Sequence, residues 1–434
     1  MKVLVLGGAV SGHAAVGLLE RLDAEIVVYD EQPGAVESFA NHGHDVASGE
    51  WTGQLLDGVD VVVASPGFAP ASAPIVSAEA AGVPIWNEVE LAIRQMTSPI
   101  VAITGTNGKT TVVELTTAML TAAGLNVVAA GNVGQAISDV ALDDWDAVVL
   151  EVSSFQLART ESLRPRAAVI LNVAPDHLDW HGSYAAYRDA KARIFRHLQP
   201  DDLLTYDADD RGASDLVATA PGRHTPVSGT RVPDGGYGVR GGVLVIPNQE
   251  IPLDRIPVAD ASYRMDLVAA AVAASTMGAT SEATESVIIA FEPAHHRRSL
   301  VGVWDEIAWV NDSKATNPHA SLAAITSYPS VVLIAGGRNK GLDLSRLTSA
   351  PNVHFLIAIG EAADDLLASS GHRSARRARS MEEAISIASS VARPGDTVLL
   401  SPGCASFDMF GSYGERGDTF TRLVHESNER ESNG

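Results

Sequence analysis

The chain has 434 residues, of which 46% are hydrophobic and 19% are charged, and its formal net charge is −22. This length exceeds one ordinary hydrophobic core and predicts two to three domains, while the composition excludes a disordered or fibrous chain. The strong negative charge excludes a nucleic-acid partner, because a phosphate backbone requires a basic surface.

The first 95 residues predict a Rossmann-like α/β domain. An apolar strand over residues 2–6 leads into the glycine-rich stretch 7–12 and a helical segment, and the next strand ends at Asp30. This pattern suits NAD or another nucleotide-like ligand, and a second nucleotide site downstream favours the latter. Since the strand begins almost at the first residue and no apolar run reaches about 18 residues, we expect neither a signal peptide nor a membrane segment.

Two further features of this region concern ligand binding and the domain boundary. The strand 59–64 runs into Ser65 and Gly67, at the end of a strand where parallel sheets bind ligands, although a plain turn would have the same residues. Helical periodicity over 88–95, followed by Ser-Pro at 98–99, predicts a boundary near residue 96.

Residues 100–111 predict a nucleoside-triphosphate site. The apolar run 100–104 is typical of a buried parallel strand, and the pattern from Lys109 onward is helical. Glycines in the intervening turn let the backbone approach an anion, which the amide groups and dipole at the helix N-terminus attract. We expect Lys109 to reach the β- and γ-phosphates and the Thr110 hydroxyl to bind Mg²⁺. Ile103 stands where the usual eight-residue pattern has its first glycine, and a tight turn with an exposed lysine is the alternative.

The strands that follow predict a P-loop type parallel sheet with metal ligands at its edge. The apolar strand 147–151 ends in Glu151, and a carboxylate at a strand end near a phosphate loop is a usual Mg²⁺ ligand. After the strand 167–172, residues 174–181 contain two histidines and two aspartates. This cluster could suggest zinc, but with no cysteine nearby and a phosphate site beside it, a magnesium-linked role is favoured.

Lys191 falls on the apolar face of a predicted helix over 183–197. It lies seven residues after Tyr184, four after Tyr187 and three before Ile194. A lysine on a buried face needs a partner or a lowered pKa. The alternative is a side chain that extends along the apolar surface and keeps its ammonium in water.

The remainder predicts the end of the central domain and a third, Rossmann-like α/β domain. Residues 201–260 are expected to form short strands and turns, 261–277 and 281–291 two helices, and residues near 294 a boundary. Four strands, at 307–310, 331–335, 355–359 and 397–400, predict a parallel sheet with polar clusters after each strand, where such sheets place their sites. The single cysteine, Cys404, excludes an internal disulfide and is typical of a reducing cytoplasm. We expect the tail from residue 426 to be frayed.

Five motifs together resemble the Mur ligase family over essentially the whole chain: residues 105–111, 151–154, 176–179, 187–191 and 311–317. The last of these, with residues 401–408, is most similar to the branch that adds D-glutamate. The resemblance implies domains at 1–95 for UDP, 96–294 for ATP and 295–434 for the amino acid. It also implies that ATP phosphorylates the carboxylate of UDP-N-acetylmuramoyl-L-alanine and that the amine of D-glutamate attacks the acyl phosphate. We therefore expect a monomeric cytoplasmic ligase of peptidoglycan precursor synthesis.

The resemblance also implies residue roles. Phosphate binding falls to Gly105, Thr106, Asn107, Gly108, Lys109, Thr110 and Thr111, and the ATP ribose to Asp312. One Mg²⁺ would be held by Thr110 and Glu151, and a second by His177 and a carbamylated Lys191. The cations beside the transferring phosphoryl group would be Lys109, Arg297 and Lys314. The incoming amino acid would contact Thr316, Lys340, Ser406, Phe407 and Tyr413. The UDP-sugar would pass Ser65, Gly67, Asn132, Ser153 and Gln156, with its uracil at Val10, Ser11 and Asp30.

The chain departs from the family pattern at two places. Ser262, Tyr263 and Asp266 replace a His-Asn pair and a later Asn that contact adenine, and residues 31–32 replace a Thr-Arg pair seen near uracil in some relatives. Two alternatives stay open: another amino-acid ligase of the same architecture, such as a folylpolyglutamate synthetase or a different Mur ligase, and a catalytically silent nucleotide-binding subunit. An intact set of phosphate and metal residues argues against the second.

Overall fold

The computed structural model describes residues 1–257, 260–371 and 374–432, which form two compact units. The first unit comprises Met1–Val173 and Trp180–Phe291, and the second comprises Ala174–Asp179 and Glu292–Gly434. Each unit is described by itself. The three domains with boundaries near residues 95 and 294 stay a prediction.

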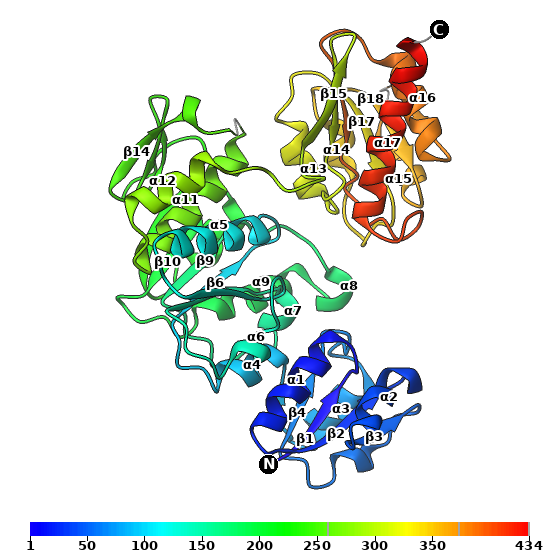
Figure 1. The fold of residues 1–434 in the computed structure, drawn as a ribbon. Helices are drawn as coiled ribbons and strands as arrows, with labels where there is room; N and C mark the ends of the chain where they lie inside the picture. The colour runs from blue at the N-terminus through cyan, green and yellow to red at the C-terminus, as the bar shows by residue number, and fades with distance from the viewer. Residues whose placement is uncertain (258–259, 372–373, 433–434) are drawn as a thin grey trace. The chain divides into compact units, whose positions relative to one another are not determined.

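The first sheet has five parallel strands in the order β3-β2-β1-β4-β5 (Figure 1). Val3 and Val5 of β1 enter one apolar cluster and Leu4 and Leu6 another, so the strand is buried on both faces, which explains its unbroken apolar run. The elements are β1 (Lys2–Leu6), α1 (Val10–Arg21), β2 (Glu25–Asp30), α2 (Pro33–Asn41), β3 (Asp45–Ser48), η1 (Gly53–Leu56), β4 (Val61–Ala64), α3 (Ala73–Ala80), β5 (Ile85–Trp86) and α4 (Glu88–Ile93).

The second sheet has six parallel strands in the order β11-β10-β9-β6-β8-β7. The strand predicted at 100–104 is β6, with β9 and β8 as its neighbours. The strands are β6 (Ile100–Thr104), β7 (Val127–Gly131), β8 (Ala147–Glu151), β9 (Ala167–Ile170), β10 (Leu203–Asp207) and β11 (Arg223–Val227). The helices are α5 (Lys109–Ala122), α6 (Ile137–Val140), α7 (Ser154–Leu157), α8 (Leu178–His181), α9 (Tyr184–Ala192), η2 (Arg193–Phe195), α10 (Arg211–Val217), α11 (Ala261–Thr276) and α12 (Ser281–Ile289).

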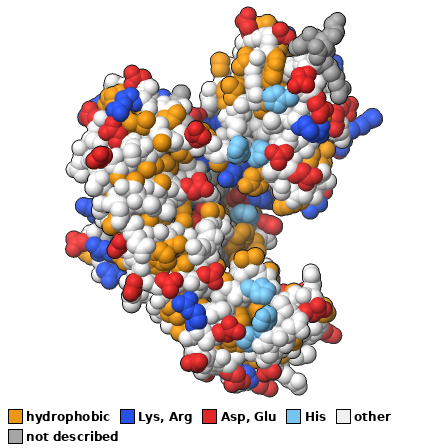
Figure 2. All heavy atoms as spheres, viewed as in Figure 1, with side chains coloured by type: hydrophobic (Ala, Val, Ile, Leu, Met, Phe, Trp, Pro, Cys, Tyr) orange, Lys and Arg blue, Asp and Glu red, His pale blue; other side chains and the backbone are white. Residues whose placement is uncertain are grey.

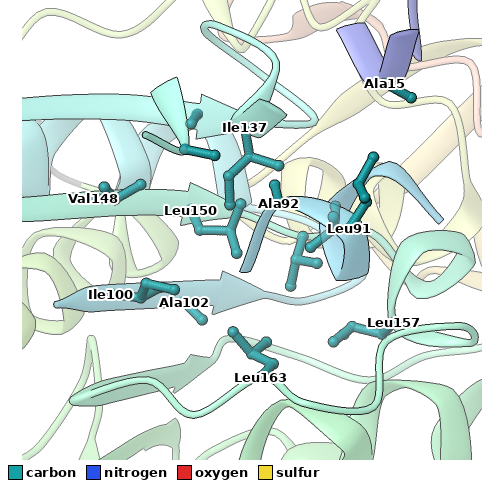
Figure 3. Packing of buried hydrophobic residues seen from close by; sticks show 14 of the residues in the cluster. Ala15, Leu91, Ala92, Ile100, Ala102, Ile137, Val148, Leu150, Leu157 and Leu163 are labelled. Atoms are coloured by element: carbon teal, nitrogen blue, oxygen red, sulfur yellow. The ribbon is translucent and has the colours of Figure 1, made fainter. Parts of the chain in front are cut away.

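The two faces of this sheet are covered by different helices. Alternate residues of β6 and β8 meet α4 and α6 on one face, where Leu91, Ile137 and Leu150 lie close together (Figure 3). On the other face α5 packs against α11 and α12 (Figure 1). A small antiparallel sheet follows, made of β12 (Gly238–Arg240), β13 (Val243–Ile246) and β14 (Gln249–Pro252), with η3 (Leu253–Arg255) after it.

The third large sheet, in the second unit, has the order β15-β16-β20-β17-β18-β19. Its strands are parallel except for the edge strand β15, which is antiparallel to β16. The elements are β15 (Ser299–Trp304), β16 (Ile307–Asn311), α13 (Pro318–Ile325), β17 (Val331–Gly336), α14 (Ser345–Ser349), β18 (Val353–Ile359), α15 (Ala363–Ser369), β19 (Ser374–Arg377), α16 (Met381–Val391), β20 (Thr397–Leu400) and α17 (Tyr413–Ser432).

The three-sheet α/β fold class is confirmed, with corrections of detail. The third sheet has six strands rather than the four predicted, because the edge strands β15 and β19 lack the unbroken apolar run of a buried parallel strand. Residues 201–260 also contain the helix α10, which Asp210 caps by accepting from the Ala213 amide. The expected frayed tail is wrong for residues 426–432, which continue α17 to Ser432 beyond Phe420 and Val424, both buried against the sheet; residues 433–434 lie outside the described part of the chain.

The surface agrees with the acidic composition. Asp and Glu side chains are spread over the visible face rather than gathered in one patch (Figure 2). Across residues 1–257, 260–371 and 374–432, no helix combines the length and the apolar character that membrane crossing requires.

Candidate active site

The turn between β6 and α5 has the form of an anion site. Thr104 ends the strand, Lys109 begins the helix, and Gly108 caps the helix with a φ of 88°. This is the left-handed region that favours glycine. A Cβ on Gly108 would lie 2.8 Å from Asp266 Oδ1, so the position is sterically closed to other residues as well. The predicted strand, glycine turn and helix are confirmed.

Asn172 and Tyr187 hold this turn in place. The Thr106 amide donates to the Asn172 carbonyl (2.8 Å) and the Asn107 amide to Asn172 Oδ1 (2.7 Å), while Asn172 Nδ2 donates to the Asn107 carbonyl (3.1 Å). The hydroxyls of Thr106 and Tyr187 lie 2.8 Å apart. The shape of the loop is thus set by β9 and α9.

Two lysine ammonium groups converge on the same turn. Lys109 Nζ donates to the carbonyls of Gly105 (2.9 Å) and Thr106 (3.1 Å). Lys191 Nζ donates to the Gly105 carbonyl (2.8 Å) and to Thr104 Oγ1 (3.3 Å), and its side chain is 1% exposed. The prediction that Lys191 faces inward is confirmed, and the alternative of an ammonium kept in water is wrong. Its carbamylation stays a prediction.

Glu151 supplies the carboxylate of this site. It is 1% exposed, its Oε1 accepts from Asn132 Nδ2 (2.8 Å), and its Oε2 has no hydrogen-bond partner among the described residues. β8 pairs with β6 so that Glu151 lies opposite Ile103, and Thr104 Oγ1 donates to the carbonyl of Val152 (2.8 Å). A buried carboxylate oxygen without a donor is costly unless a cation meets it. With the Thr110 hydroxyl at the start of α5, this donor set fits Mg²⁺.

A second acidic group lies behind the turn. Asp266 on α11 is 1% exposed and lies against Gly108. Asp207, at the end of β10, has its pKa raised to about 7, first by burial and then by its neighbours Asp209, Asp210 and Asp266. The Asp209 amide donates to Asp207 Oδ1, and this hydrogen bond opposes the rise in the pKa of Asp207.

Replacement of Asp207 by asparagine should stabilise the protein above pH 7. The folded protein keeps the proton on Asp207 up to about pH 7, whereas the unfolded chain releases it near pH 3.8. The folded state therefore binds more protons across this interval, and the free energy of unfolding contributed by this group falls as pH rises. At about 1.4 kcal/mol per pKa unit, the gain at pH 8 is at most about 4 kcal/mol. Urea unfolding of the wild type and of Asp207→Asn at pH 4.5 and pH 8 measures this gain. If the two proteins differed in free energy of unfolding by the same amount at both pH values, the raised pKa of Asp207 would be contradicted.

The residues predicted to meet uracil lie after β1 and at the end of β2, and two residues predicted to line the path of the UDP-sugar lie after β4. Asp30 Oδ2 accepts from the Gly8 amide (2.9 Å), so this carboxylate fixes the glycine turn after β1. Val10 is 80% exposed at the start of α1, with Ser11 beside it. Ser65 follows β4 and its side chain lies against Gly7; Gly67 is exposed in the same turn. Ligand contacts at these positions stay predictions.

Ser153 and Gln156 form the cap of α7. The Ser153 hydroxyl accepts from the Gln156 amide, and Gln156 Oε1 accepts from the Ser153 amide (2.9 Å). This capping box places both side chains just after Glu151. Their predicted contact with the UDP-sugar is not tested by this arrangement.

In the second unit, Asp312 lies directly after β16 and is 3% exposed. Its carboxylate accepts from the Arg298 amide (3.2 Å) and from the Ser401 hydroxyl (2.7 Å). Burial raises the pKa of Asp312 to about 6, and Arg298 and Arg297 oppose that rise. The predicted ribose-binding carboxylate and the predicted phosphoryl-binding Arg297 are therefore close to each other.

A second cluster of this unit surrounds Asp176, which is 4% exposed. Its carboxylate accepts from Lys340 Nζ (3.2 Å) and from Asn317 Nδ2 (3.2 Å), and its Oδ1 accepts from the His177 amide (2.9 Å). His177 has a φ of 52°, an uncommon conformation for a residue other than glycine. The two predicted ligands of the second metal, His177 and Lys191, fall in different units, and their shared role stays a prediction.

The remaining predicted contacts of the amino acid lie on the loops after β16 and β20 and at the start of α17. Lys314 Nζ lies 6.0 Å from the centre of the Tyr413 ring, and the Thr316 amide donates to the Lys314 carbonyl (2.9 Å). Ser406 is 2% exposed, whereas Phe407 is 66% exposed. The exposed ring of Phe407, next to the buried Ser406, is therefore available to a ligand.

Comparison with known proteins agrees with this geometry. The sequence matches three family models: Mur ligase MurD-like, N-terminal domain (residues 1–87), Mur ligase middle domain (103–230) and Mur ligase, glutamate ligase domain (296–404). A UDP-N-acetylmuramoylalanine--D-glutamate ligase of Frankia casuarinae is 40% identical over 452 residues, covering 98% of this chain and 94% of the relative. The chain belongs to the Mur ligase family.

Other members of the Mur ligase family support this assignment. The enzyme of the same name from Salinibacter ruber is 39% identical, with 98% of this chain and 97% of the relative covered. The crystal structure of UDP-N-acetylmuramate-alanine ligase from Thermotoga maritima matches with a TM-score of 0.58 at 17% identity, covering 98% of this chain and all (100%) of that one. At this identity the match shows the shared fold alone. The resemblance inferred from the five motifs is confirmed.

Among the positions where the chain departs from the Mur ligase pattern, the side chains of Tyr263 and Asp266 are buried, whereas residues 31–32 are exposed. Tyr263 is 3% exposed and packs edge-on against Phe291, with ring centres 5.7 Å apart. The amide and hydroxyl of Ser262 both donate to Asp260 Oδ1 (2.8 Å each), which is the cap of α11. Asp266 lies beside the glycine turn and therefore borders the phosphate loop.

Sequence reasoning missed the supporting residues of this site. From the sequence, Asn172 was a strand end and Tyr187 and Asp176 lay within family motifs, but none of the three was assigned a supporting role. Their partners lie far away in the sequence: 65 residues separate Asn172 from Asn107 and 164 separate Asp176 from Lys340. A polar residue at the end of a strand next to β6 was the available signal for Asn172.

Proposed function

We propose that the chain is an ATP-dependent ligase that adds D-glutamate to UDP-N-acetylmuramoyl-L-alanine through an acyl phosphate, a step of peptidoglycan precursor synthesis in the cytoplasm. The observation that carries the proposal is the full-length similarity to D-glutamate ligases, at 40% and 39% identity over 98% of the chain. The glycine turn with Lys109, Glu151 and Lys191 around it supplies the chemistry that such a reaction needs.

The first chemical step brings two anions together. A carboxylate oxygen of the UDP-linked substrate attacks the γ-phosphorus of ATP, the bond from that phosphorus to the bridging oxygen breaks, and ADP leaves. The protein has to stabilise negative charge and align the reactants, since no side-chain nucleophile is required. The amides of the glycine turn, the N-terminus of α5 and the ammonium of Lys109 would serve this task, and their position at one turn supports the proposal.

Two Mg²⁺ ions would neutralise charge on the phosphates. Thr110 and Glu151 would hold one, which agrees with the unpartnered buried Oε2 of Glu151. His177 and a carbamylated Lys191 would hold the other. Carbamylation joins the Lys191 amine to CO2 with loss of a proton, and the product is a carboxylate-like group that suits a hard cation better than an ammonium does.

The second step is attack of the D-glutamate amine on the carbonyl carbon of the acyl phosphate, with loss of phosphate and of an amine proton. Asp312 would bind the ribose of ATP, and Arg297 and Lys314 would lie beside the phosphoryl group. The side chains that would hold D-glutamate are Thr316, Lys340, Ser406, Phe407 and Tyr413. Lys340 is the cation of this set, and its ion pair with Asp176 (3.2 Å) fixes it next to His177.

The acceptor substrate would lie along the first unit. Its uracil would contact Val10, Ser11 and Asp30, and the sugar and diphosphate would pass Ser65, Gly67, Asn132, Ser153 and Gln156. Asn132 supports this path, since it donates to Glu151 and thus lies where the reacting carboxylate must arrive.

A substrate panel tests the proposed function. Phosphate release from ATP should depend on both UDP-N-acetylmuramoyl-L-alanine and D-glutamate. The acceptors to compare carry L-alanine, L-serine or glycine, and the amino acids include L-glutamate as the matched control for D-glutamate. Turnover with L-glutamate and a folate acceptor, or with UDP-N-acetylmuramate and L-alanine, would favour another ligase of the family. Absence of any turnover with bound ATP would favour a silent nucleotide-binding subunit.

A further inference from the structure

Arg416, on the first turn of α17, has a guanidinium group buried between two loops. Its side chain is 1% exposed. Nε donates to the Ser313 hydroxyl (2.9 Å), Nη2 to the Ser313 carbonyl (2.8 Å) and Nη1 to the Cys404 carbonyl (3.2 Å). None of these three acceptors is a carboxylate.

The two loops leave the sheet side by side. Ser313 follows β16 and Cys404 follows β20, and these strands are parallel neighbours. The Gly403 amide also donates to the Ala315 carbonyl (2.9 Å), which links the loops a second time. The loop after β16 carries Asp312, proposed for ATP, and Thr316, proposed for the amino acid. The loop after β20 carries Ser406 and its neighbour, also proposed for the amino acid.

The start of α17 is tied to the same place. The Ser313 hydroxyl donates to the Tyr413 carbonyl (2.7 Å), and Asn311 Nδ2 donates to the Gly417 carbonyl (2.8 Å). Arg416 therefore completes a network in which the helix, the loop after β16 and the loop after β20 share hydrogen bonds.

Burial of this cation is unfavourable in itself. It lowers the pKa of Arg416 to about 10, because the charged form loses its hydration. A planar guanidinium directs several donors in fixed directions, which a lysine ammonium cannot reproduce. A hydrophobic side chain of similar size would avoid the desolvation, so the benefit of arginine lies in fixing the geometry of its acceptors.

We propose that Arg416 is a positioning residue that holds residues 312–316 and 401–407 in one arrangement, so that the sites for ATP and for the incoming amino acid form together. This inference rests on the proposed function for the identity of the two ligands. The fixed arrangement itself rests only on the hydrogen bonds of Arg416, Ser313 and Cys404.

The experiment compares Arg416→Met and Arg416→Lys with Arg422→Met. Arg422 lies on the same helix, is exposed and pairs with Glu426, so it controls for loss of a cation from α17. Arg416→Met should raise KM for ATP and for D-glutamate by about tenfold or more and leave KM for UDP-N-acetylmuramoyl-L-alanine unchanged. Arg416→Lys should show the same two increases, and Arg422→Met none. Amide hydrogen exchange should speed up in residues 312–316 and 401–407 in the Arg416 variants.

The proposal would be overturned if Arg416→Met kept the KM values and exchange rates of the wild type. It would also be overturned if KM rose equally for ATP, D-glutamate and UDP-N-acetylmuramoyl-L-alanine. If that variant does not fold, Arg416→Lys decides in the same way. A failure of the proposed function is distinct, because the wild-type chain would then show no D-glutamate-dependent turnover. The exchange measurement would still test the positioning of the two loops.

Discussion

Replacement of Lys191 by alanine is expected to abolish most of the ligase activity, by about 10²–10³-fold in kcat. Lys191 is buried with its amine on the Gly105 carbonyl, where a carbamate would present oxygen atoms to a cation beside the phosphate loop. Added acetate or propionate should restore part of the rate to this variant, because a free carboxylate can occupy the space of the missing group. Steady-state phosphate release with and without these acids is the measurement.

Two controls separate this role from a structural one. Arg196→Ala removes an exposed cation five residues further along and should retain the wild-type rate. Lys191→Met keeps most of the side-chain volume and should be as inactive as the alanine variant while unfolding at a similar temperature. Carbon-13 NMR of the wild-type protein in labelled bicarbonate should show a carbamate signal that Lys191→Met lacks. Full activity of Lys191→Met, or no labelled carbamate in the wild type, would refute carbamylation.

Replacement of Glu151 by glutamine is expected to separate metal binding from stability. In the absence of divalent ions this variant should be as stable as the wild type or more so, because a neutral amide replaces a buried carboxylate whose Oε2 has no donor. The contact with Asn132 can persist, since the amide oxygen still accepts a hydrogen bond. The rate at saturating Mg²⁺ should fall by about 10²-fold or more.

The decisive measurement is thermal unfolding with a non-hydrolysable ATP analogue, with and without Mg²⁺. Mg²⁺ at a hundred times its dissociation constant stabilises the wild type by about 2.7 kcal/mol through mass action, and Glu151→Gln should lose this response. Glu114→Gln, an exposed position on α5, is the matched control and should keep it. An unchanged Mg²⁺ response in Glu151→Gln would remove Glu151 from the metal site.

Parts of the site that depend on neighbouring residues could be predicted from the sequence. The apolar run of β6, the glycine turn and the helical pattern of α5 lie within about 25 consecutive residues, and each follows local rules of periodicity and turn geometry. The inward face of Lys191 followed from Tyr184 and Tyr187 on the same helix and from Ile194, which lies in the adjoining η2. The five motifs and their order along the chain were then enough to identify the family.

Long-range contacts could not be predicted in this way. The hydroxyl pair of Thr106 and Tyr187 joins residues 81 positions apart, and Arg416 reaches Ser313 across 103 positions. Nothing in the local pattern of α17 distinguishes Arg416 from Arg422, yet one is buried and the other is exposed. Only packing of the helix on the sheet makes that difference.

The sequence by itself determined the α/β class, the glycine turn and the inward lysine, because these follow from periodicity and residue spacing over short distances, and the resemblance of its motifs indicated the family. The tertiary structure decided which groups support the loop, that Glu151 keeps a buried oxygen without a donor in the described part of the chain, and that Tyr263 is buried. Strand order brings distant residues together, and their burial sets both the cost of each unpaired polar group and the pKa of each acid.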